Sequence, residues 1–133
     1  GRVTLKKPVD GAIINGFSGD QLVFYAAMNM WATHNGIDIQ ADQGAEVVAA
    51  MAGTVTQIYT SESDGGVVII SHSHTSQTVY MGLDDISVEA GEKVNAGQAI
   101  GTVGTMPSES DLSYHLHFEY IVDGKYKNPA NFF

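Results

Sequence analysis

Residues 53–71 read GTVTQIYTSESDGGVVIIS and predict a β-hairpin. β-branched and aromatic residues are concentrated in Gly53–Tyr59 and Val67–Ser71, as is typical of strands. Asp64-Gly65-Gly66 lies between them and is a strong hairpin signal, because tight hairpin turns need residues that tolerate positive φ. This stretch therefore indicates antiparallel β structure.

The same pattern recurs along the chain, in which fifteen glycines separate short β-branched runs. Further strands are expected at Val47–Ala50, Thr78–Met81, Ala99–Val103 and His115–Ile121, with a second turn at Asp123-Gly124. The sequence predicts one compact, mainly β domain.

Two segments depart from this pattern. Gly19–Met30 favours a short helix, since Leu22, Phe24, Tyr25 and Met28 could form one apolar stripe of core contacts. Thr105–Asp111, like Ser61–Asp64, is polar enough to predict a surface loop.

Composition excludes several classes of function. The 133 residues carry a formal charge of −9, with six Lys and Arg against fifteen Asp and Glu, which argues against binding to nucleic acid or anionic membranes. The absence of cysteine excludes disulfides, thiolate metal sites and cysteine nucleophiles. No apolar run reaches the roughly 18 residues of a membrane span, and no signal peptide is visible.

Histidine spacing points to a metal site. His115 and His117 lie two apart in an expected strand and therefore share one face, with Leu116 and Phe118 on the other. His34 and Asp38 also share a face if their segment is extended, which Gly36 favours over a helix. Two histidines and one carboxylate make a three-ligand zinc site that leaves a fourth position open.

His-x-His alone is a weak signal, and paired strand histidines without a metal are common. His72 and His74 form a second such pair. We expect His74 in an exposed turn, and His72 in structural hydrogen bonding.

Several ordered motifs resemble the M23 or LytM-type zinc metallopeptidases, which cut the peptide cross-links of bacterial peptidoglycan. The matching motifs run from about Trp31 to Phe133 and are His34-Asn-Gly-Ile-Asp38, Gly44–Val55, Val67–His72, Val88–Gly104, His115-Leu-His-Phe-Glu119 and Asn128-Pro129. The resemblance divides the chain into an N-terminal extension, 1–30, packing on a LytM/M23-like domain, 31–133.

The family resemblance implies a twisted antiparallel sheet of the barrel-sandwich-like type, with a narrow groove over the metal. It implies that His34, Asp38 and His117 bind zinc. It also implies that His115 is the non-ligand histidine that orients water or stabilises an oxyanion.

Position 82 departs from the family pattern. Active members have Tyr-x-His-Leu where this chain has Tyr80-Met-Gly82-Leu83. Glycine can neither polarise water nor donate to an oxyanion, and the loss of one such group typically costs about two to three orders of magnitude in rate. The predicted metal ligands are therefore all present, whereas one of the catalytic residues of the family is missing.

Gly82 and the upstream Gln21-Leu-Val-Phe-Tyr25 resemble the sporulation branch of this family, the stage II sporulation protein Q group. That resemblance implies a membrane-anchored, extracytoplasmic domain in the intermembrane space of the engulfed forespore. It implies stage III sporulation protein AH as the partner, docked through edge strands or an acidic face that includes Glu62, Asp64, Asp84, Asp85 and Glu89.

Two alternatives remain open at this point. The first is a working zinc endopeptidase acting on peptidoglycan peptides, in which Tyr80, Tyr114 or His74 replaces the missing histidine. The second is a biotinyl- or lipoyl-type carrier, which Val88–Gly101 resembles. A carrier needs a lysine at a hairpin tip, and none of Lys6, Lys7, Lys93, Lys125 and Lys127 is suitably placed.

Overall fold

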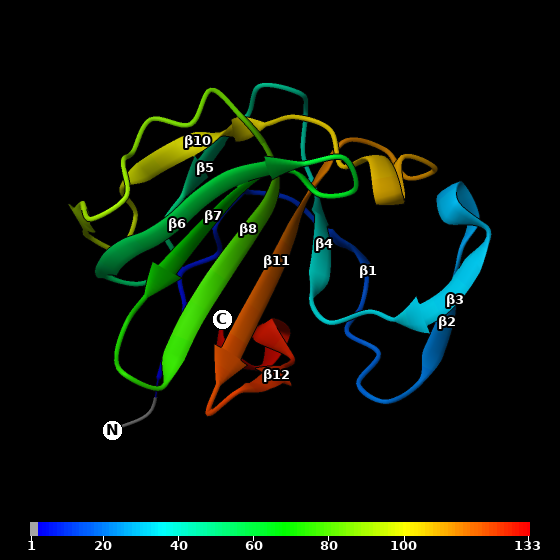
Figure 1. Ribbon diagram of the computed structural model, residues 1–133, viewed down its shortest axis with the longest axis horizontal. Coiled ribbons are helices and arrows are strands. Elements are labelled where there is room, and N and C mark those ends of the chain that lie inside the picture. The colour runs from blue at the N-terminus through cyan, green and yellow to red at the C-terminus, as the bar shows by residue number, and fades with distance from the viewer. Residues whose placement is uncertain (1–2) are drawn as a thin grey trace.

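The computed structural model describes residues 3–133 as a mainly antiparallel β structure (Figure 1). The main sheet has the strand order β1-β4-β11-β8-β7-β6-β9, with β10 pairing β5 and β8, and β12 pairing β11. Its strands are β1 (Ile13–Asn15), β4 (Ile37–Gln40), β5 (Glu46–Val48), β6 (Gly53–Ser61), β7 (Gly65–Ser71), β8 (Ser76–Asp84), β9 (Lys93–Val94), β10 (Ala99–Val103), β11 (His115–Val122) and β12 (Lys125–Lys127). The predicted fold class is confirmed.

Both predicted turns join antiparallel partners. β6 and β7 pair through Ser61 and Gly65 at their closed end, and Gly65 has a φ of 70°. β11 and β12 are joined by Asp123 and Gly124, whose φ values are 53° and 74°. Positive φ at both central residues is the requirement of the tightest hairpin turn, and Asp-Gly meets it.

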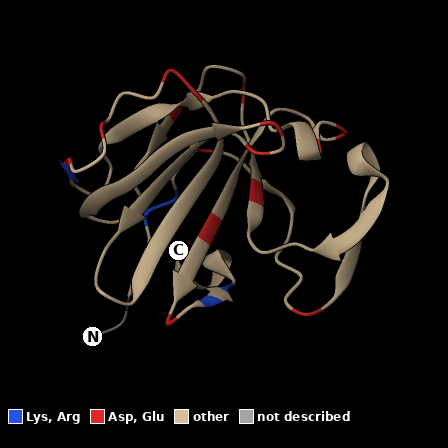
Figure 2. Ribbon diagram, viewed as in Figure 1, with Lys and Arg blue, Asp and Glu red and all other residues tan. Residues whose placement is uncertain are grey.

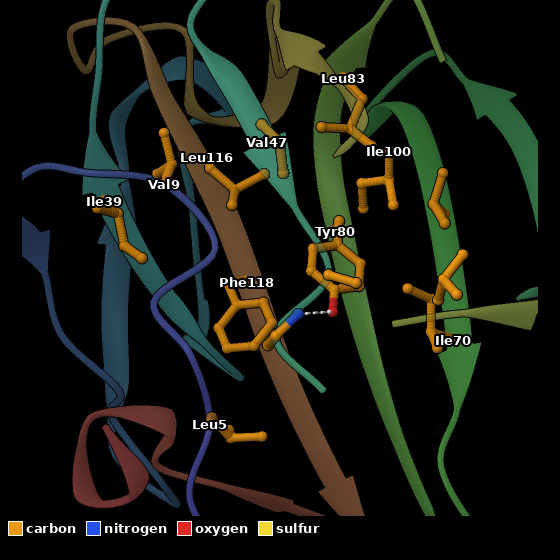
Figure 3. Packing of buried hydrophobic residues seen from close by; sticks show 14 of the residues in the cluster. Leu5, Val9, Ile39, Val47, Ile70, Tyr80, Leu83, Ile100, Leu116 and Phe118 are labelled. Carbon is orange, nitrogen blue, oxygen red and sulfur yellow. Dashed lines mark hydrogen bonds between the residues drawn. The ribbon is translucent and has the colours of Figure 1, made fainter. Parts of the chain in front are cut away.

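The hydrophobic core lies on one side of β4, β11, β8 and β7 (Figure 3). Leu116 and Phe118 of β11 point into it beside Tyr80 of β8, whose ring centroid is 5.2 Å from that of Phe118. The Tyr80 hydroxyl accepts a hydrogen bond of 2.9 Å from the backbone N–H of Ala50, so its polar end is satisfied inside the core. The alternation along β11 therefore leaves His115 and His117 on the opposite face.

The N-terminal residues join this core. Leu5 and Val9 are buried within it, and β1 pairs with β4 of the main sheet. The backbone N–H of Leu5 donates to the carbonyl of Phe132 at 2.8 Å, which ties the two ends of the chain together.

The prediction of a short helix over Gly19–Met30 is wrong. The segment forms β2 (Leu22–Tyr25) and a single 3₁₀ turn, η1 (Ala26–Met28), and β2 pairs with β3 (Met30–Thr33) in a separate hairpin that projects from the main sheet (Figure 1). Asn29, at a φ of 50°, ends η1 and turns the chain back. Four consecutive apolar residues are compatible with either a strand or a helix. Pairing with β3 makes this segment a strand.

The expected core stripe is also wrong, because Leu22, Phe24 and Met28 face solvent and only Tyr25 is partly buried. Leu22 is 62% exposed and Trp31 is 63% exposed, while Phe24 and Trp31 contact each other across the hairpin with ring centroids 5.4 Å apart. We call Leu22, Phe24, Met28, Met30 and Trp31 the apolar hairpin surface.

Charged residues are sparse on the sheet and more frequent in the loops (Figure 2). Asp38 on β4 and Glu119 on β11 are buried acidic residues on neighbouring strands. Among residues 3–133, no helix has the length and apolar composition needed to cross a membrane. Two further 3₁₀ turns complete the structure, η2 (Pro107–Glu109) and η3 (Pro129–Phe132).

Candidate metal centre

Asp38 and His117 lie directly opposite each other on β4 and β11. The register pairs His117 with Asp38, and their Nδ1 and Oδ1 atoms are 2.9 Å apart. Both side chains are buried on the face of the sheet opposite Leu116. Strand pairing thus brings together two of the residues that the sequence singled out.

His34 reaches the same point from the segment that follows β3. Its Nε2 lies 3.2 Å from Oδ2 of Asp38. The expectation that residues 34–38 are one extended stretch is only partly right, because β4 begins at Ile37. Gly36 permits the approach, since a Cβ there would lie 2.2 Å from the Phe118 carbonyl oxygen.

The outer nitrogens of both histidines are held by acceptors. Nδ1 of His34 donates to the Gly16 carbonyl at 2.8 Å, and Nε2 of His117 donates to Oε2 of Glu119 at 2.9 Å. These bonds favour the tautomers in which Nε2 of His34 and Nδ1 of His117 present lone pairs to the centre. Such outer hydrogen bonds orient histidines that ligate metals.

Glu109 is the residue that sequence reasoning missed. Its Oε2 lies 3.0 Å from Nε2 of His34, and its Oε1 lies 3.3 Å from Nδ1 of His117. The carboxylate is therefore in the centre of the cluster, and Glu109 is only 2% exposed.

The prediction of a surface loop over Thr105–Asp111 is therefore wrong for the residues in the middle of this segment. Met106, Ser108 and Glu109 are buried, because η2 folds back over the sheet. No spacing rule could have found Glu109, since a single acidic residue in a polar stretch has no period, and its partner His34 is 75 positions away.

His115 flanks the cluster on β11. Its Nε2 lies 2.9 Å from Oε1 of Glu109 and 3.5 Å from Oδ1 of Asp38, while its Nδ1 donates to the Ser113 carbonyl at 2.7 Å. His115 therefore contacts the same carboxylates as His34 and His117 do.

The electrostatics of the cluster favour a positive charge at its centre. Burial lowers the pKa of His34, but hydrogen bonds to Asp38 and Glu109 outweigh it and raise the pKa to about 9. The pKa of His117 and of His115 is also raised, against burial, by hydrogen bonds to these carboxylates. Burial would raise the pKa of Glu109, yet its bonds to the three histidines hold it well below its usual range.

The donor set fits a metal ion. His34, Asp38, Glu109 and His117 each offer one ligand atom, and these atoms lie within 4.8 Å of one another. Individual separations of 2.9 to 3.3 Å between the nitrogens and carboxylate oxygens are close to the edge of about 3.3 Å expected for a tetrahedron with ligand bonds of about 2.0–2.1 Å. This His/Asp/Glu cluster could therefore bind a metal.

Gly82 lies beside the cluster, one residue beyond the last paired residues of β8 and β11. Its φ is 83°, and a Cβ at this position would meet the Cβ of Met106 at 3.4 Å. The glycine thus has a backbone role, because few L side chains adopt this conformation.

The remaining histidines are outside the centre, as predicted. His72 is bonded through Nδ1 to the Ala52 carbonyl and through Nε2 to Oγ1 of Thr78, each at 2.8 Å. His74 is exposed in the turn between β7 and β8. Both expectations are confirmed.

Three surface depressions meet at Glu109, with volumes of about 280, 150 and 160 Å³. His115 lines the first and His117 lines the third. Glu109 thus lines depressions on more than one side of the cluster.

Comparison with known proteins places this geometry in a family. The model of peptidase family M23 matches residues 32–129. Stage II sporulation protein Q of Bacillus subtilis is 37% identical over 106 residues, which cover 78% of this chain and 38% of that protein. The chain thus spans well under half the length of this relative.

Solved structures agree. A chain in the SpoIIQ-SpoIIIAH pore forming complex superimposes with a TM-score of 0.88 at 30% identity, covering 99% of this chain and 92% of that one. A zinc containing peptidase from Vibrio cholerae gives a TM-score of 0.80 at 29% identity, covering 95% of this chain and 39% of the peptidase. This chain belongs to peptidase family M23.

Proposed function

We propose that this chain is a zinc-binding, catalytically degenerate M23 domain that acts in protein–protein association. The observation that carries the proposal is Gly82, which occupies the position where active members have a histidine. Its φ of 83°, which L side chains rarely adopt, supports a glycine at this position. A peptidase lacking this group would have lost about two to three orders of magnitude in rate.

Zinc is the metal we assign to the centre, with His34, Asp38 and His117 as ligands. Imidazole and carboxylate donors suit zinc, and the similar Vibrio cholerae peptidase contains it. When bound, zinc would act as a Lewis acid. Its ligands would also connect β4, β11 and the segment before β4. His115 would keep the position of the water-orienting histidine, without its partner at position 82.

The partner we assign is stage III sporulation protein AH. The support is the similarity to stage II sporulation protein Q and to a chain in the SpoIIQ-SpoIIIAH complex. In this proposal the domain is extracytoplasmic, anchored to the forespore membrane in the full-length protein, and faces the mother cell membrane. The acidic face and the apolar hairpin surface are the two candidate contact regions. Exposed apolar clusters such as the second are typical of interaction sites.

The test has two measurements on the zinc-loaded domain. The first incubates it with purified peptidoglycan and counts new amino termini, with the Vibrio cholerae peptidase as the active control. We expect no cleavage above background. The second is capture by the ectodomain of stage III sporulation protein AH, which we expect to succeed. Zinc-dependent cleavage that His115→Ala abolishes, or no capture at any salt concentration, would contradict the proposal.

A second candidate function is an active zinc endopeptidase that cleaves peptidoglycan cross-links. The convergence of His34, Asp38, His117 and His115 on one point favours it. Two of the suggested substitutes for the missing histidine receive no support, because the Tyr80 hydroxyl is bonded in the core and His74 is exposed outside the centre. The third, Tyr114, lines the same surface depression as His115. The peptidoglycan measurement separates the two candidates directly.

A further inference from the structure

Glu109 is the fourth donor of the cluster, beside His34, Asp38 and His117. Its two oxygens contact three imidazoles: Oε2 lies 3.0 Å from Nε2 of His34, and Oε1 lies 3.3 Å from Nδ1 of His117 and 2.9 Å from Nε2 of His115. We propose that Glu109 is a fourth protein ligand, which closes the metal centre and makes it a structural site. This inference rests on the zinc assignment of the proposed function and deepens it.

The segment that carries Glu109 is fixed in place by its own backbone. The N–H of Glu109 donates to the Met106 carbonyl at 2.9 Å, and the N–H of Leu112 donates to the Glu109 carbonyl at 3.0 Å. The N–H of Ser108 donates to the carbonyl of Ser63 in the β6–β7 loop, also at 2.9 Å. Pro107 fixes the start of η2. Glu109 is therefore held over the centre by the fold.

Gly82 and Glu109 are linked through Met106. Met106 is buried with its Cβ 3.4 Å from where a Cβ of residue 82 would lie, and the Thr105 carbonyl carbon is 3.7 Å from the same point. A side chain at position 82 would therefore begin beside the segment that carries Glu109.

A closed site has a different chemistry from an open one. Structural zinc sites fill all four positions with protein ligands, whereas catalytic sites keep one for water or substrate. With Glu109 among the ligands, neither water nor a peptide carbonyl could reach the metal without displacing a buried carboxylate. Glu109 also lines both the depression that His115 lines and the one that His117 lines.

The experiment compares the wild-type chain with Glu109→Ala and Glu109→Gln. The first variant opens the position, and the second keeps the shape while removing the charge. Each protein is loaded with Co²⁺ as a spectroscopic substitute for zinc and titrated with azide. We expect the wild-type visible spectrum to be unchanged by azide and that of Glu109→Ala to respond. Zinc affinity, measured against a competing chelator, is expected to fall about tenfold or more in both variants, since even outer-shell changes cost about 10- to 100-fold.

Asp111→Asn is the matched control, because Asp111 is an exposed acidic residue in the same segment. It is expected to behave as the wild type in both measurements. The proposal is overturned if wild-type Co²⁺ protein already binds azide, or if both Glu109 variants keep the wild-type zinc affinity and spectrum.

These outcomes are distinct from failure of the proposed function. A wild-type chain that binds no metal refutes the zinc assignment itself. Cleavage of peptidoglycan by the wild type refutes the degenerate role. Full zinc loading with no contribution from Glu109 refutes only the fourth ligand.

Discussion

Nε2 of His34 lies 3.0 Å from Oε2 of Glu109, although the two residues are 75 positions apart in the sequence. His34 arrives from the segment between β3 and β4, and Glu109 from the 3₁₀ turn after β10. His34 is one of the ligands predicted from the family pattern, whereas Glu109 is not part of that pattern. The cluster therefore combines the three ligands predicted from the sequence, His34, Asp38 and His117, with an additional carboxylate.

Glu119→Gln is expected to weaken zinc binding without touching the metal. Oε2 of Glu119 accepts from Nε2 of His117 at 2.9 Å, which fixes the tautomer and increases the basicity of Nδ1. Loss of such a partner typically lowers metal affinity about 10- to 100-fold. Chelator competition measures the effect. Glu62→Gln, the same change at an exposed residue, is the control; equal affinities in the two variants would refute the role of Glu119.

The metal-free protein is expected to lose stability as the pH rises. Hydrogen bonds to Asp38 and Glu109 outweigh burial and raise the pKa of His34 to about 9 in the folded state, above its unfolded value near 6.5. The stabilisation from protonated His34 is therefore complete below about pH 6.5 and is lost as the pH rises through about 9. Urea unfolding of chelator-treated protein at pH 6, 7.5 and 9 measures this.

Zinc is expected to reverse that dependence. Metal and protons compete for the same nitrogens, so zinc affinity increases with pH while proton-linked stability declines. The difference in unfolding free energy between loaded and metal-free protein should therefore grow from pH 6 to pH 9. A constant difference would show that the histidines are not the metal ligands.

The apolar hairpin surface provides a further prediction. Phe24→Ser with Trp31→Ser is expected to lower capture by stage III sporulation protein AH, because Phe24 and Trp31 are exposed and contact each other. Apolar contact would make binding insensitive to salt, whereas docking through the acidic face would weaken as salt rises. Capture at two salt concentrations distinguishes the surfaces. Unchanged capture by the double variant would exclude the hairpin.

The sequence predicted those features that depend on local pattern. The alternation around His115 and His117, and the turn at Asp123-Gly124, are set by residues within a few positions of one another. The β2–β3 hairpin was missed because Leu22–Tyr25 is too short for its period to distinguish strand from helix. Glu109 was missed because its burial results from packing between distant segments, which leaves no trace in local spacing.

Position 82 provides a prediction on stability. Gly82→Ala is expected to destabilise the protein by about 1–2 kcal/mol, since an L residue at this positive φ is strained. The added methyl would lie in van der Waals contact with Met106, 3.4 Å from its Cβ. Gly124→Ala is the matched control, because its φ is 74° but no atom lies within 4 Å of the added Cβ. In urea unfolding, the loss of unfolding free energy in Gly82→Ala beyond that in Gly124→Ala measures the packing contribution. Equal losses in the two variants would show that the packing of Met106 does not depend on the glycine.

The same position decides whether activity can be restored. Gly82→His alone is expected to give no peptidoglycan cleavage, because Glu109 still lies among His34, His115 and His117. Gly82→His with Glu109→Ala both returns the histidine and opens the metal position, so any restored cleavage should appear only in the double variant. Counting new amino termini released by zinc-loaded single and double variants measures this. Cleavage by Gly82→His with Glu109 intact would show that the carboxylate does not close the centre.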